Sequence, residues 1–94
     1  MAKLSEDAIH STLTQMSGWS VVDGMLRKTY RFSTFPDGIA FVNRVADLAE
    51  DMGHHPDIDI RYSTITVSLS THDEGGITEK DTALARRIEG LLDR

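Results

Sequence analysis

Residues 34–53, TFPDGIAFVNRVADLAEDMG, predict the longest helix of the chain, and the other elements can be placed around it. Thr34 followed three positions later by Asp37 has the pattern of a capping box. Pro36 falls in the first turn, where its missing N–H costs nothing, and Gly53 is typical of a helix end. Apolar residues recur at helical spacing and predict the buried face, namely Ile39, Val42, Val45, Ala46, Ala49 and Met52. This segment is therefore expected to be the central core helix.

Residues 57–71, DIDIRYSTITVSLST, follow that helix and predict a β-hairpin. Apolar and polar residues alternate on both sides of a short connection near Tyr62 and Ser63, as they do in half-buried strands. The apolar positions are Ile58, Ile60, Ile65, Val67 and Leu69, and the polar positions of the second strand are Thr64, Thr66, Ser68 and Ser70. We expect the polar face to be open to solvent or to another subunit.

A second hairpin is predicted upstream, in residues 19–32, WSVVDGMLRKTYRF. The pair Asp23-Gly24 between two segments of strand-like composition is a strong hairpin signal. One side of the second arm carries Leu26, Lys28, Tyr30 and Phe32, and the other carries Arg27, Thr29 and Arg31. Only the first of these sides is expected to be buried.

Two terminal helices complete the chain. Residues 5–16 predict a helix that begins near Ser5 and ends before Gly18. The last helix opens at Thr78, with Asp81 completing a capping box, and its expected inward residues are Leu84, Ala85, Ile88, Leu91 and Leu92. The order α-β-β-α-β-β-α predicts one α+β domain over residues 1–94, a four-stranded antiparallel sheet with three helices on one face.

Composition limits the function classes. The 94 residues hold ten Lys and Arg against fifteen Asp and Glu, a formal net charge of −5 without a basic run, which disfavours direct binding to nucleic acid or to an anionic membrane. The absence of cysteine excludes a disulfide framework, a thiolate nucleophile and a cysteine-based zinc site. No apolar run approaches the roughly 18 residues of a membrane span, and no signal-peptide core is present, so we expect a cytoplasmic protein.

Three of the four histidines are predicted to meet at one end of the sheet. His54 and His55 precede the hairpin of residues 57–71, and His72 follows it; His54 and His72 each lie nine positions from Ser63. Hairpin pairing therefore carries the imidazoles to the same end. The acidic residues expected nearby are Glu50, Asp73, Glu74 and Asp81.

The residues alone leave three interpretations of this cluster open. Imidazoles titrate near pH 6.5, so they can exchange protons without a cofactor, and the helix end favours a protonated His54 as general acid. Three histidines with a carboxylate also suit zinc or non-haem iron, although adjacent histidines are awkward ligands for one ion. The third interpretation is a solvated loop, with Asp81 serving only as a helix cap.

A specific pattern narrows these alternatives. The succession His54-His55-Pro56, Tyr62, LSTH ending at His72, Gly76 and the Thr78 to Asp81 segment resembles the signature of the pterin-4a-carbinolamine dehydratases. This family is also known in animals as the dimerisation cofactor of a homeodomain transcription factor. The resemblance extends to Gly18-Trp19 and to the chain length, and the family's fold agrees with the element order predicted above.

The resemblance implies a dehydratase that eliminates water from 4a-hydroxytetrahydrobiopterin, giving quinonoid dihydropterin in tetrahydrobiopterin recycling, with no metal or organic cofactor. It implies the catalytic residues His54, His55, His72 and Asp81, with His54 and His72 as the acid/base pair and His55 orienting the substrate or sharing the acid/base work. The implied substrate contacts are Glu50, Pro56, Ser70, Thr71, Asp73 and Glu74. It also implies a homodimer or homotetramer, and a binding scaffold of the same fold is the alternative function.

Overall fold

The structure is a computed structural model that describes residues 2–92. Its elements follow the predicted order, with one added 3₁₀ turn: α1 (Glu6–Leu13), β1 (Ser20–Val22), β2 (Met25–Arg31), α2 (Phe35–Met52), β3 (Asp57–Arg61), β4 (Thr64–Leu69), η1 (His72–Glu74) and α3 (Glu79–Gly90). The predicted α+β fold, a four-stranded antiparallel sheet with three helices, is confirmed.

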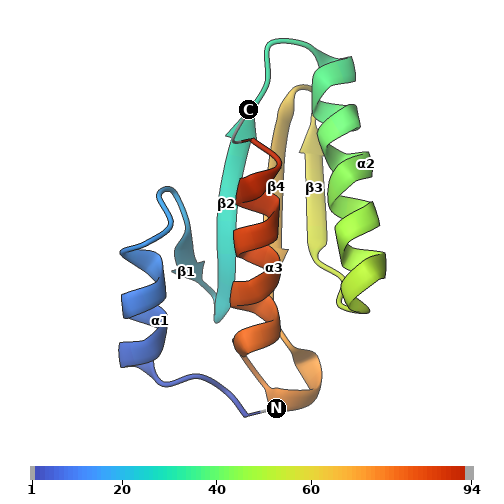
Figure 1. The fold of residues 1–94 in the computed structure, drawn as a ribbon. Coiled ribbons are helices and arrows are strands. Elements are labelled where there is room, and N and C mark those ends of the chain that lie inside the picture. The colour runs from blue at the N-terminus through green and yellow to red at the C-terminus, as the bar shows by residue number, and fades with distance from the viewer. Residues whose placement is uncertain (1, 93–94) are drawn as a thin grey trace.

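The sheet has the strand order β1-β2-β4-β3, and every neighbouring pair is antiparallel. Both predicted hairpins form. Asp23 and Gly24 turn with positive φ angles of 52° and 76°, as a type I′ hairpin turn requires. This topology brings the β1–β2 turn, the C-terminal end of α2 and η1 to the same end of the molecule, the lower end in Figure 1.

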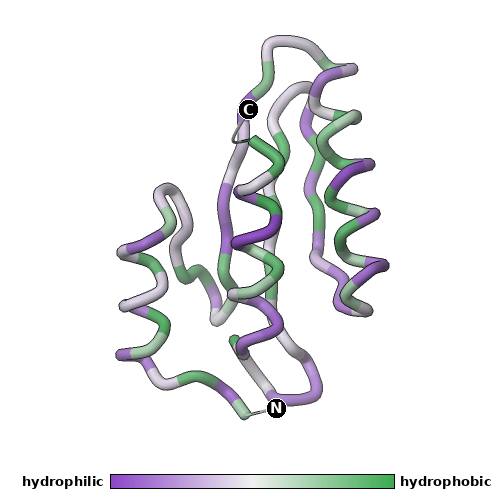
Figure 2. Tube along the Cα trace, in the orientation of Figure 1, coloured by the Kyte–Doolittle hydropathy of each residue, from purple (hydrophilic) through white to green (hydrophobic). Residues whose placement is uncertain are grey.

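The helices cover the apolar face of the sheet. In Figure 1, α3 lies over β2 and β4 and runs along them while α2 lies beside β3, and Figure 2 shows hydrophobic residues recurring along β4 and along both helices. The buried core comprises Met16, Trp19, Leu26, Tyr30, Phe41, Val45, Ile65, Val67, Leu69, Ile77, Leu84, Ala85 and Ile88. Within residues 2–92, no helix combines the length and apolar composition needed to cross a membrane.

Three details of the sequence prediction are wrong. α1 ends at Leu13 rather than near residue 16, and Met16 is buried from the turn that follows. The buried stripe of α2 runs through Gly38, Phe41, Val45 and Ala49, so Ala46 is exposed on a neighbouring row of the helix. Leu92 lies beyond the end of α3 and is 43% exposed.

A polar cluster joins α3 to β2. The Glu89 carboxylate accepts hydrogen bonds from Trp19 Nε1 at 3.1 Å, from Lys28 Nζ at 2.9 and 3.0 Å, and from the Tyr30 hydroxyl at 2.5 Å. Burial raises the pKa of Glu89, but the hydrogen bonds from Tyr30, Lys28 and Trp19 and the Lys28 charge together hold it below its ordinary value. Burial is the main cause that raises the pKa of Tyr30, and the hydrogen bond to Glu89 raises it further. Glu89 thus fixes α3 to the sheet through three donors.

The opposite face of the sheet is polar, as predicted. Arg27 lies across Ser68 and donates from Nε to its hydroxyl at 2.9 Å, and the Thr29 and Thr66 hydroxyls are 3.0 Å apart. Because Arg27 covers it, Ser68 is only 7% exposed although no helix packs on this face in Figure 1.

Candidate active site

A hollow of about 290 Å³ lies where α2 ends, β4 ends and α3 begins. Six of its lining residues were predicted as site residues from the sequence, namely His54, His55, Ser70, Thr71, His72 and Asp73. Gly53 and Lys80 complete the lining. The pairing of β3 with β4 therefore brings His72 to the same hollow as the adjacent His54 and His55.

Gly53 sets the position of the histidine pair. It ends α2 in the left-handed region at φ 62°, with its amide directed at Ala49 and Glu50 carbonyl oxygens. The next amide, that of His54, donates to the Ala49 carbonyl at 3.1 Å. His54 is thus fixed by the backbone directly below the C-terminus of α2.

We expect Gly53→Ala to lower the free energy of unfolding by about 1 kcal/mol, because a Cβ is disfavoured at positive φ. Nothing lies within 4 Å of the added Cβ, so the cost is purely conformational. Gly90→Ala is the matched control: its Cβ also meets open space, but its φ is not left-handed, and alanine there should stabilise α3 slightly. Urea denaturation of both variants measures the difference, and equal effects would contradict the account.

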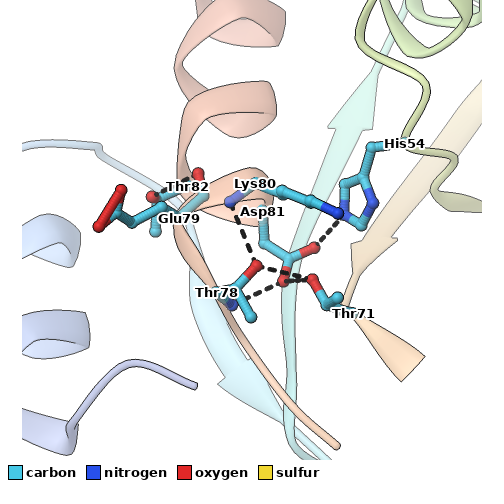
Figure 3. Close-up of polar contacts among 7 residues, drawn as sticks. All are labelled: His54, Thr71, Thr78, Glu79, Lys80, Asp81 and Thr82. Atoms are coloured by element: carbon cyan, nitrogen blue, oxygen red, sulfur yellow. Dashed lines mark hydrogen bonds and ion pairs between the residues drawn. The ribbon is translucent and has the colours of Figure 1, made fainter. Parts of the chain in front are cut away.

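The buried centre of the site is a His54–Asp81 pair. Asp81 is fully buried, and its Oδ1 lies 2.5 Å from His54 Nε2 (Figure 3). Its Oδ2 accepts from the Thr71 hydroxyl and from the Thr78 backbone N–H, both at 2.9 Å. The predicted capping box at Thr78 is therefore present, and the same carboxylate also holds a histidine of the hollow.

A chain of hydroxyl groups supports Asp81. The Lys80 amide donates to Thr78 Oγ1 at 3.2 Å, and Thr78 Oγ1 lies 2.8 Å from Thr71 Oγ1. Since the single hydroxyl proton of Thr71 goes to Asp81, the proton between the two threonines must come from Thr78. The hydrogen bonds of this chain, from the Lys80 amide through the Thr78 and Thr71 hydroxyls, therefore all point toward the Asp81 carboxylate.

This arrangement fixes the tautomer of His54. A carboxylate offers only acceptor oxygens, so Nε2 is the nitrogen that carries the proton and donates to Asp81. Within residues 2–92 the other ring nitrogen, Nδ1, has no hydrogen-bond partner. Because the His54 side chain is 11% exposed and lines the hollow, Nδ1 is available to a ligand there.

The other two imidazoles are more accessible. His55 pairs with the Glu50 carboxylate, and both side chains are largely exposed, at 61% and 77%. His72 is the first residue of η1 and is exposed. The site therefore combines one oriented, nearly buried imidazole with two that are open to solvent.

The remaining predicted site residues lie near the hollow without lining it. Glu50 pairs with His55, which lines the hollow, and Pro56 and Glu74 are not among the lining residues. The sequence reasoning missed Lys80, whose side chain extends toward His54 in Figure 3. A lysine in the first turn of a helix opposes the helix dipole, and that unusual placement was the available signal.

The metal interpretation finds no cluster to support it in the part of the chain that the structure describes. Residues 2–92 contain no group of three or more His, Cys, Asp or Glu side chains arranged to hold a metal ion. Two of the three imidazoles are instead paired with separate carboxylates, His54 with Asp81 and His55 with Glu50.

Comparison with known proteins gives a consistent result. Residues 2–91 match the family described as pterin 4 alpha carbinolamine dehydratase. A relative from Herpetosiphon aurantiacus, provisionally named for the same activity, is 57% identical over 92 residues, covering 98% of this chain and 96% of its own. One from a Mycobacterium species (strain JLS), named in the same way, is 52% identical over the full length of both chains.

Two solved structures share the fold. A crystal structure titled as a transcriptional coactivator/pterin dehydratase from Brucella melitensis has a TM-score of 0.90 at 31% identity, covering 95% of this chain and 97% of its own. A pterin dehydratase-like protein described as a RuBisCO assembly factor in the alpha-carboxysome has a TM-score of 0.64 at 26% identity, covering 80% and 87%. On the sequence match and the identity to these relatives, the chain belongs to the pterin 4 alpha carbinolamine dehydratase family.

Proposed function

We propose that the protein is a 4a-hydroxytetrahydropterin dehydratase that works by histidine acid/base chemistry. The observation that carries the proposal is the buried His54–Asp81 pair opening into a hollow that two further imidazoles line. Such a set can move protons near neutral pH without help from a metal. Family membership supports the same reaction class.

The reaction needs one proton delivered and one removed. The C4a–O bond breaks, the departing hydroxyl takes up a proton and leaves as water, N5 loses its proton, and a C4a=N5 double bond forms in quinonoid dihydropterin. Two positioned groups that titrate near neutrality are suited to this exchange. No net proton is consumed, because the acid and the base are restored by one transfer through solvent.

We assign the two transfers to His54 and His72. Asp81 orients His54 through Nε2, protonated His54 delivers a proton to the departing hydroxyl, and His72 takes the proton from N5. His55, held by Glu50, orients the substrate at the edge of the hollow. The exposure of His72 lets it release its proton to water and return to the neutral state.

The test is a rapid-mixing assay in which freshly generated 4a-hydroxytetrahydropterin is followed as it loses the carbinolamine absorbance. The parent protein is expected to accelerate dehydration, and His72→Ala to lower kcat about tenfold or more. His10→Ala, an exposed histidine on α1 outside this hollow, is the matched control and should leave the rate unchanged. A parent protein without any acceleration, or a His72→Ala variant as fast as His10→Ala, would rule out the proposal.

A scaffold function is the second candidate. The two structural relatives described as a coactivator and as an assembly factor support it, since both share this fold. The complete set of His54, His55, His72 and Asp81 favours the enzyme, because a scaffold needs no oriented imidazole in a hollow. A catalytically silent parent protein with the fold intact would favour the scaffold.

A further inference from the structure

The loop that carries His72, residues 71–76, is closed by its own backbone. The Thr71 amide donates to the Gly76 carbonyl at 2.8 Å, and the Gly76 amide donates back to the Thr71 carbonyl at 3.3 Å. The Thr71 hydroxyl also donates to Asp81 at 2.9 Å. Within residues 2–92, the His72 side chain itself has no hydrogen-bond or ion-pair partner. The position of this imidazole therefore depends on how firmly the backbone of its loop is held.

The start of the chain contacts the C-terminal end of this loop. The Leu4 amide donates to the Ile77 carbonyl at 2.8 Å, directly after the loop. The Lys3 side chain lies so close to Gly76 that a Cβ added there would be 2.7 Å from Lys3 Cδ and 3.0 Å from Lys3 Cγ. Figure 1 shows the segment before α1 running to this loop. We call Lys3 and Leu4 the N-terminal strap.

The bond from Leu4 joins two anchored segments. The Ile77 side chain is buried in the core, and the Leu4 side chain packs against that core. Directly after the strap, the Ser5 side chain caps α1. The strap therefore ties the C-terminal end of the loop to α1, while Thr71 ties its N-terminal end to α3 through Asp81.

The ordinary role of such a segment is to start the helix. Leu4 precedes the Ser5 cap, and Ile9 is the fourth residue of α1, which is the spacing of a hydrophobic staple. A staple needs only the Leu4 side chain. It explains neither the Leu4 amide, which donates to Ile77, nor the Lys3 side chain, which lies along the loop. Those two contacts hold the loop rather than the helix.

We propose that the N-terminal strap positions His72 for proton transfer, so that Lys3 and Leu4 are positioning residues of the dehydratase. The inference rests on the proposed function, in which His72 takes the proton from N5. Neither strap residue lines the hollow of about 290 Å³, so neither contacts a substrate bound there. Weakening the strap should therefore slow the chemical step and leave KM nearly unchanged.

The first experiment removes the amide proton of Leu4. Leu4→Pro lacks the N–H that bonds to Ile77, and position 4 lies before the cap of α1, where proline does not interrupt the helix. We expect kcat to fall about fivefold, with KM changed less than about twofold. Leu4→Ala keeps the N–H and should recover most of that kcat. Leu13→Ala, at a partly buried apolar position of α1 outside the strap, controls for lost packing and should leave kcat unchanged.

A second comparison separates positioning of His72 from general loosening of the fold. In a His72→Ala background, Leu4→Pro should cause no further loss of kcat, because the strap acts through that imidazole. A purely structural strap would slow both backgrounds equally. A further loss of similar size in His72→Ala, or a Leu4→Ala variant as slow as Leu4→Pro, would overturn the proposal and leave the dehydratase standing.

If Leu4→Pro does not fold, the Lys3 side chain provides the decisive variants. Lys3→Gly removes the stem that lies against Gly76 and should lower kcat about twofold, whereas Lys3→Met keeps an apolar stem without the charge and should be faster than Lys3→Gly. Equal kcat values of the two variants would overturn the proposal.

If the parent protein does not accelerate dehydration, the proposed function fails, and amide hydrogen exchange tests the strap alone. The Glu74 and Gly75 amides bond to the Thr71 and His72 carbonyls within the loop, at 3.1 Å each. Leu4→Pro, or Lys3→Gly in its place, should speed the exchange of these two amides about fivefold, while the amides of β4 exchange as in the parent. Unchanged exchange in the loop would show that the strap does not hold it.

Discussion

Replacing Asp81 with asparagine is expected to lower kcat for dehydration about 100-fold to 10,000-fold while the protein stays folded. The amide oxygen can keep the bonds from Thr71 and the Thr78 backbone, but the NH₂ group then faces His54 Nε2. The Nε2 atom of His54 must then accept a hydrogen bond where it donated one before, so the ring proton moves to Nδ1, the nitrogen that has no hydrogen-bond partner within residues 2–92. We expect a stability loss of about 1 to 2 kcal/mol from the weakened bonds.

The loss of kcat caused by Asp81→Asn should not add to the loss caused by replacing His54. His54→Ala alone and the double variant with Asp81→Asn are expected to be as slow as Asp81→Asn, because both residues act as one unit. Asp37→Asn is the matched control, since Asp37 occupies the same third position after a threonine cap in α2 and lies outside the hollow. Additive losses in the double variant, or a normal rate for Asp81→Asn, would contradict the role given to the pair.

The largest effect on stability outside the site is expected at Glu89. Glu89→Gln keeps the shape of the side chain but replaces one acceptor oxygen with an NH₂ group among three donors, so we expect about 2 kcal/mol lower stability in urea denaturation. Glu79→Gln, on the exposed first turn of the same helix, is the control and should cost a few tenths of a kcal/mol. If Glu89→Gln were as stable as Glu79→Gln, the cluster around Glu89 would contribute nothing to the stability of the folded protein.

The pH dependence of stability provides a second measurement at Glu89. Its pKa is lower in the folded protein than the ordinary 4.5, so below that value the unfolded chain binds protons more readily. The contribution of Glu89 is therefore complete above pH 4.5 and is lost as the pH falls through the lowered pKa. The stability difference between the parent and Glu89→Gln should shrink over that acidic range, whereas a difference that is constant with pH would contradict an ionic origin.

The sequence predicts the element order well because each element carries its own local signal. The Asp23-Gly24 turn, the Thr78 capping box and the alternation in β4 need no tertiary information. Placement of His54 and His72 at one end of the sheet also followed from local facts, since a hairpin with a short turn fixes which residues are opposite. These are the parts of the site that spacing alone can supply.

The parts that spacing could not supply depend on packing between distant segments. Glu89 meets Trp19 and Tyr30 across 70 and 59 positions, which requires α3 to lie over β2. Ala46 was expected inward because alanine is apolar, but the buried residues of α2 are Gly38, Phe41, Val45 and Ala49, and a Cβ added at Gly38 would lie 3.4 Å from Ile65 on β4. Spacing alone explained Asp81 only as a cap, and its bond to a histidine was expected from the family resemblance rather than from the pattern of the first turn. The homodimer or homotetramer stays a prediction.

Because Asp81 belongs to the first turn of α3 and also holds His54, which lines the hollow, the site exists only while that turn is closed. Transient opening of this turn breaks the Thr78 and Thr71 bonds and releases His54 in the same event. A bound ligand that contacts His54 must then slow hydrogen exchange of the amides of Thr78 and Asp81, even though those amides bond within the turn, to the Asp81 carboxylate and to the Thr78 carbonyl. Slower hydrogen exchange of the amides at the start of α3 would thus show that a ligand occupies the hollow.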